Sequence, residues 1–117
     1  MVIKRGSQVP AAELAGYPGV SKQIILGPLD GSEEIVLRYF RLDKGSTTPR
    51  HAHDFPHLVK VESGYGLAVG PDGTEKPIGP GDYVFVPANE LHSFKNAGEK
   101  AFEFVCIVPG RGEPPTA

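Results

Sequence analysis

The chain has little cysteine, no tryptophan and no excess of either charge sign. Its single cysteine, Cys106, excludes an intrachain disulfide and is typical of a reducing compartment, so we expect a cytoplasmic protein. The net charge of −2 provides no basic surface for nucleic acid or an anionic membrane. No apolar run is long enough to cross a bilayer, and the charged N-terminus lacks the apolar segment of a signal peptide. We therefore expect neither nucleic-acid nor membrane partners.

Long helix-forming segments are also scarce, whereas turn-forming residues are abundant. The 117 residues include 15 glycines and 12 prolines, spread along the chain. Short β-rich runs lie between them at 23–26, 35–42, 57–63, 66–70, 74–78, 83–87, 92–96 and 101–108. Short strands divided by turn signals predict an all-β sandwich or barrel. We expect one domain over residues 1–117, with one short helical turn at 10–15 and a loose tail at 110–117.

Histidine is rare but concentrated. Three of the four histidines lie in "HAHDFPH", residues 51–57, and the fourth is His92. In an extended segment alternate side chains share a face, so His51 and His53 can reach one metal ion. Pro56 lacks an N–H and interrupts the strand, and the resulting turn can return His57 to the pair. Imidazole is the commonest metal ligand and suits Zn, Cu, Fe and Ni.

The structural alternative is a set of ordinary surface histidines, since a single His-x-His pair is a weak signal. In this chain, however, all four histidines fall within the proposed site and none lies elsewhere. This concentration favours a site for one divalent ion, with His92 as the ligand that a distant hairpin supplies.

The alternation of the strands also predicts the wall of the site. If His92 points inward, every second residue of its strand does so too, and the last strand has one face rich in aromatic residues. These faces predict a wall of Arg38, Phe40, Phe94, Phe104 and Cys106. The phenylalanines could equally be plain core, Cys106 a small buried hydrophobe, and Arg38 a solvent-exposed side chain. An inward Arg38 would anchor an anionic substrate.

Two motifs make the chain resemble the cupin superfamily. The first cupin motif, Gly-x5-His-x-His-x3–4-Glu-x6-Gly, corresponds to "GSTTPRHAHDFPHLVKVESG" at 45–64. The second, Gly-x5-Pro-x-Gly-x2-His-x3-Asn, corresponds to "GDYVFVPANELHSFKN" at 81–96. The resemblance implies a double-stranded β-helix, or jelly-roll, barrel. It also implies a metal site made of His51, His53, His57 and His92.

The chain departs from these motifs at two positions. Asn89 replaces a glycine, and because asparagine tolerates left-handed backbone we expect the same turn. His57 stands where most cupins carry glutamate. Four neutral ligands leave a divalent ion with its full charge, which favours Lewis acidity. Small single-domain cupins with four histidines are a known subgroup, and this sequence is similar to them.

This resemblance implies one divalent transition metal per chain, with Mn or Fe favoured and Zn, Ni or Cu as alternatives. Four protein ligands in an octahedral shell leave two positions for a substrate and dioxygen or water. We therefore expect a dioxygenase-type oxidoreductase that acts on a small organic molecule. The alternatives are a Lewis-acid lyase or isomerase, and a non-enzymatic protein that binds a metal or a small molecule.

We also expect a homodimer. Small cupins commonly pair their barrels, and the N-terminal "MVIKR" has the composition of a strand that could add to a partner's sheet edge.

Overall fold

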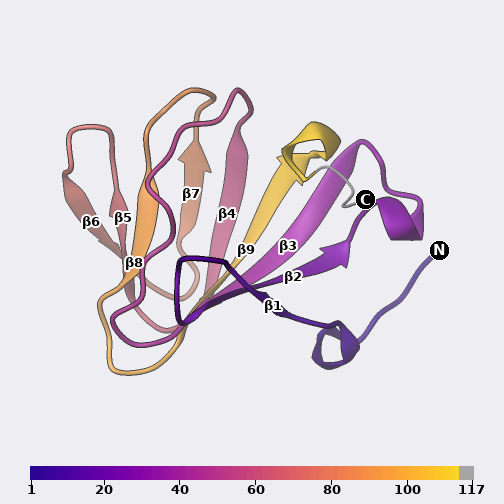
Figure 1. Cartoon of the computed structure of the whole chain (residues 1–117), viewed down its shortest axis with the longest axis horizontal. Helices are drawn as coiled ribbons and strands as arrows, with labels where there is room; N and C mark the ends of the chain where they lie inside the picture. The colour runs from indigo at the N-terminus through magenta and orange to yellow at the C-terminus, as the bar shows by residue number, and fades with distance from the viewer. Residues whose placement is uncertain (114–117) are drawn as a thin grey trace.

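Two antiparallel sheets form the protein, in a computed structural model that describes residues 1–113 (Figure 1). The larger sheet has the strand order β1 (Ala12–Glu13), β2 (Val20–Leu26), β3 (Ile35–Leu42), β9 (Phe102–Pro109), β4 (His57–Ser63) and β7 (Tyr83–Val86). The smaller sheet has the order β6 (Glu75–Ile78), β5 (Gly66–Val69) and β8 (Ser93–Asn96). The predicted all-β jelly-roll fold is confirmed.

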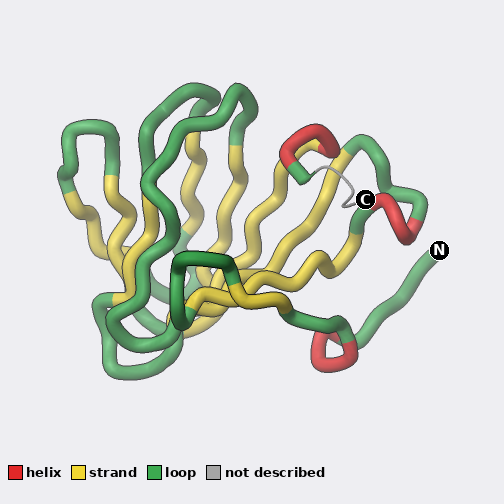
Figure 2. Tube along the Cα trace, viewed as in Figure 1, coloured by secondary structure: helices red, strands yellow, loops and turns green. Residues whose placement is uncertain are grey.

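In the described residues, helix is confined to three single 3-10 turns, which are η1 (Gly6–Gln8), η2 (Pro28–Asp30) and η3 (Gly110–Gly112). Figure 2 shows them at the periphery of the sheets. Within residues 1–113, no helix has the length and apolarity that a membrane crossing requires.

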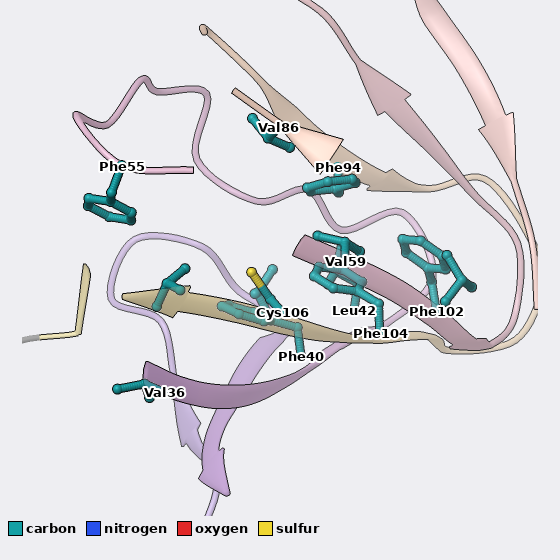
Figure 3. Packing of buried hydrophobic residues seen from close by; sticks show 13 residues of the cluster. Val36, Phe40, Leu42, Phe55, Val59, Val86, Phe94, Phe102, Phe104 and Cys106 are labelled. Carbon is teal, nitrogen blue, oxygen red and sulfur yellow. The ribbon is translucent and has the colours of Figure 1, made fainter. Parts of the chain in front are cut away.

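The core lies between the sheets and follows from strict alternation along β3 and β9. In β9 the residues Phe102, Phe104, Cys106 and Val108 are buried, while their neighbours are partly exposed. The register places Phe40 of β3 opposite Phe104, and their rings stack with centroids 5.2 Å apart. Figure 3 shows both rings and the sulfur of Cys106 in the interior. The alternation therefore turns aromatic rings and one thiol toward the space that also receives the histidines.

Two local expectations are wrong, each because a distant contact outweighs the local signal. Residues 10–15 form no helical turn, because Ala12 and Glu13 pair with β2 as strand β1. Residues 1–5 form no strand within the single chain, and their expected addition to a partner's sheet edge stays a prediction. In the expected loose tail, residues 110–112 form η3 and Glu113 makes ion pairs with the barrel. The remaining tail, 114–117, lies outside the described residues.

Candidate metal centre

The His-x-His segment lies in the long loop between β3 and β4 and not in a strand, as Figure 2 shows in green. Two isolated bridges hold this loop along β8, one between Thr47 and Lys95 and one between His51 and His92. The amide of Asn89 also donates to the carbonyl of His53, at 2.5 Å. The expected left-handed backbone at Asn89 is present, with φ of 68°. Extended pairing thus preserves the alternation that puts His51 and His53 together.

The ring nitrogens of three histidines converge on one point. One ring nitrogen from each of His51, His53 and His92 lies within 4.8 Å of the other two. The Nε2 atoms of His51 and His53 are 2.9 Å apart. Two nitrogens bound to one ion by bonds of about 2.1 Å at right angles lie about 3 Å apart, so the observed spacing suits a shared ion.

A backbone contact fixes which nitrogen of His92 faces the site. Nδ1 of His92 lies 2.9 Å from the carbonyl oxygen of Glu90, which can only accept a hydrogen bond. Nδ1 therefore carries the proton, and in the neutral ring Nε2 keeps a free lone pair. Such a hydrogen bond is the usual means of orienting a metal-binding histidine.

His57 begins β4 and lies beside the other three histidines. Its ring centroid is 4.9 Å from that of His92 and 5.1 Å from that of His53, and the residue is 5% exposed. Its Nδ1 contacts Cys106 Sγ at 3.3 Å and Arg38 Nη2 at 3.4 Å. Its Nε2 is buried and has no hydrogen-bond partner in the described part of the chain. His57 is not part of the group of three histidines whose ring nitrogens lie within 4.8 Å of one another.

Burial keeps the imidazoles of His51, His53 and His57 neutral. Burial, together with the neighbouring histidines and Arg38, lowers the pKa of His51 to about 4 and that of His57 to about 3. Burial also lowers the pKa of His53. The rings therefore offer lone pairs at neutral pH, which metal binding requires. The converging nitrogens, the neutral rings and the unpartnered Nε2 of His57 together make a donor set that fits one divalent transition metal.

The histidines open into a cavity of about 160 Å³. All five residues expected at its wall line it: Arg38, Phe40, Phe94, Phe104 and Cys106. Arg38 is 8% exposed and Cys106 is also buried, and burial raises the pKa of the Cys106 thiol. The cavity thus combines an aromatic wall with a buried cation next to the histidines.

Sequence reasoning missed some of the lining. Lys22 of β2 and Thr48 of the histidine loop also line the cavity, together with Leu14, Pro49 and Gly112. Glu113 reaches Lys22 and Arg38 from the C-terminal side. No local sequence pattern predicts Lys22, Gly112 or Glu113 at this site, since they come from distant parts of the chain.

A wider groove of about 700 Å³ runs between β5, β8 and β7 and also touches His92 and Phe94. Only one of the four histidines lines this groove, and turn residues such as Pro71 and Asp72 form part of its lining. Because metal chemistry needs converging ligands, the smaller cavity is the better candidate for the site.

Several solved structures share the fold. The polyketide cyclase RemF from Streptomyces resistomycificus is 26% identical with a TM-score of 0.88, over 94% of this chain and 80% of that one. A cupin 2 conserved barrel domain protein from Rhodopseudomonas palustris is 27% identical with a TM-score of 0.74, over 86% and 70%. A predicted oxalate decarboxylase from Thermotoga maritima, 23% identical with a TM-score of 0.82 over 92% and 98%, is similar in fold. No curated protein sequence matches the chain.

The model of the cupin domain family matches residues 38–108, which is more than half of the chain. The matched stretch contains all four histidines and the five expected wall residues. The chain therefore belongs to the cupin domain family.

Proposed function

We propose that the protein is a metal-dependent enzyme that acts on a small organic molecule. His51, His53 and His92 would hold one divalent transition metal ion, and His57 would be the fourth ligand. The observation that carries the proposal is the convergence of three ring nitrogens within 4.8 Å. The buried Nε2 of His57 supports the fourth ligand, because an unpartnered buried nitrogen is costly unless something binds it.

The residues of the chain would supply the metal ligands, the shape of the cavity and an apolar wall that limits water. A bound ion would add either a Lewis acid or a redox centre for dioxygen. Phe40, Phe94 and Phe104 form an apolar wall that limits water beside the histidines. For its Nε2 to bind the ion, His57 would carry its proton on Nδ1 and donate it to Cys106 Sγ, 3.3 Å away, and this contact would hold the ring in place.

Two reaction classes suit this site. The first is a dioxygenase-type oxidation with manganese or iron, supported by the all-imidazole donor set and the apolar wall. The second is Lewis-acid chemistry without redox change, supported by the similarity to a polyketide cyclase at 26% identity. Non-enzymatic binding of a metal or a small molecule is the remaining alternative.

The deciding experiment is elemental analysis of protein purified without added metal. We expect about one transition-metal ion per chain in the wild type and loss of that metal in His53→Ala. Lys44→Ala, which changes an exposed side chain, serves as the control and should keep the metal. A metal-free wild type that also fails to take up added Mn, Fe, Zn, Ni or Cu would overturn the proposal.

Oxygen uptake by the loaded protein, in the presence of candidate small molecules, separates the two classes. Turnover with oxygen consumption indicates the oxidoreductase. Turnover under argon at an unchanged rate indicates the Lewis-acid enzyme.

A further inference from the structure

Arg38 is a buried cation, and not all of its guanidinium N–H groups have a good hydrogen-bond acceptor. Its Nη2 donates to Cys106 Sγ at 3.0 Å, and its guanidinium carbon lies 5.1 Å from the centre of the Phe40 ring. Its Nη1 reaches Glu113 Oε1 only at 3.4 Å. Its Nε is buried and has no hydrogen-bond partner in residues 1–113. A planar guanidinium binds carboxylates best through two parallel hydrogen bonds, so Glu113 satisfies it poorly.

The cavity is also electropositive. Lys22 and Arg38 both line it, and its described lining includes no aspartate or glutamate. The carboxylate of Glu113 bonds Lys22 Nζ at 2.8 Å through the same Oε1 that approaches Arg38. A single oxygen therefore serves two cations. A bound divalent metal would add further positive charge beside them, so the site favours an anion.

Glu113 contacts both cations through one side-chain oxygen, and its backbone N–H bonds the carbonyl of Gly110 within the adjoining turn. It follows the short turn η3 (Gly110–Gly112) and is held to the cavity by its two ion pairs. Lys22 and Glu113 both lie outside residues 38–108, the stretch that the cupin domain family describes. Two of the three charged residues in this arrangement therefore lie outside the stretch that the family model matches.

We propose that Arg38 and Lys22 form the binding site for the carboxylate of a small organic anion, and that Glu113 is an internal stand-in which this ligand displaces. The cavity volume of about 160 Å³ and the phenylalanine wall limit the ligand to a small apolar or aromatic acid. The proposal names the substrate class of the enzyme proposed above and rests on that function only for the ligand's role as substrate.

The test uses benzoate as the probe and benzamide as its neutral counterpart, with metal-free protein so that a metal cannot bind the carboxylate. Calorimetry should show that benzoate binds at least about tenfold more tightly than benzamide, since charge-assisted hydrogen bonds carry the recognition. Glu113→Gln removes the competing charge and should tighten benzoate binding several-fold. Arg38→Gln should weaken benzoate binding about tenfold or more.

Two further variants serve as a control and as a substitute test. Glu99→Gln makes the same change in an exposed carboxylate that pairs with Lys44 at 2.6 Å, and it should leave benzoate affinity unchanged. If Arg38→Gln fails to fold, Lys22→Gln tests the same anion site from a more exposed position.

Equal affinity for benzoate and benzamide would overturn the proposal, as would unchanged benzoate affinity in Glu113→Gln. Absence of benzoate binding by both the wild type and Glu113→Gln, up to the solubility limit, would overturn it too. Metal analysis is independent of all these measurements. A protein that binds benzoate as expected but takes up no metal would contradict the proposed function alone.

Discussion

His51 and His92 exchange two backbone hydrogen bonds, with N–O distances of 3.1 and 3.0 Å. This bridge joins the loop of the first motif to the chain just before β8. Neither residue lies in a regular strand, yet the bridge gives both segments the extended geometry in which side chains alternate. The candidate metal centre therefore depends on a short piece of pairing between two loops, and its geometry is sensitive to changes in either one.

The first prediction concerns the role of His57 in metal binding. His57→Glu should retain the fold and a bound metal, because glutamate also ligates transition metals. His57→Ala should weaken metal affinity by about 10–100-fold or more, the range typical of losing even an indirect contact. Competition with a chelator measures both variants against the wild type. If His57→Ala binds metal as tightly as the wild type does, the site has three histidines and His57 only borders it.

A second prediction concerns the pH dependence of stability without metal. Histidine has an ordinary pKa of 6.5, and burial lowers that of His51 to about 4 and that of His57 to about 3. Below pH 6.5 these histidines therefore bind protons in the unfolded chain but not in the folded chain. The free energy of unfolding should fall as the pH drops from about 6.5 to about 4.

Denaturant unfolding of chelator-treated protein across this pH range measures the effect. His57→Gln removes one of the titrating rings and should flatten the profile. A wild-type stability that stays constant from pH 6.5 to 4, or rises, contradicts the depressed pKa values.

Much of the fold could be predicted because the signals that produce it are local. Strands β3 (Ile35–Leu42) and β4 (His57–Ser63) have the bounds that the sequence runs predict. Burial alternates along both strands, and glycine or proline lies near their ends. The convergence of His51 and His53 was also predictable, since it needs only an extended backbone between them.

The remaining features depend on contacts between distant residues that leave no periodic trace. Glu113 pairs with Lys22 across nearly the whole chain, and its sequence neighbourhood of glycines and prolines indicates only a loose tail. Strand β1 forms because β2 offers an edge to residues that otherwise favour a helical turn. Such pairings are fixed by the assembled barrel and cannot be inferred from a local pattern.

A third prediction tests the turn at Asn89. Its φ of 68° is in the left-handed region, which disfavours residues with a Cβ, apart from asparagine and aspartate. Asn89→Ala should therefore lower the free energy of unfolding by about 1–2 kcal/mol. Asn89→Gly, which restores the residue usual in this cupin motif, should be close to neutral. Equal losses in the two variants, measured by denaturant unfolding, would show that the side chain and not the backbone matters.

The last prediction concerns the outer face of the larger sheet, where a row of apolar side chains crosses four strands. Leu37 lies opposite Ile107, which pairs with Leu58, which in turn pairs with Phe85. Leu58 is 54% exposed and Phe85 is 60% exposed, and Tyr83 stands beside them on β7. Contiguous exposed apolar surface on a sheet is typical of an interface. We propose that a second copy of the chain covers this face in a homodimer.

Light scattering should therefore give the wild type about twice its chain mass of 12.5 kDa. Phe85→Lys places a charge at the β7 end of the apolar row and should shift the protein to the monomer, because a buried unpaired charge is strongly unfavourable. Leu29→Lys makes a comparable change at a fully exposed residue of the turn η2, away from this face, and should leave the dimer intact. A wild type of monomer mass at micromolar concentration contradicts the homodimer. A dimer that survives Phe85→Lys places the interface elsewhere on the barrel.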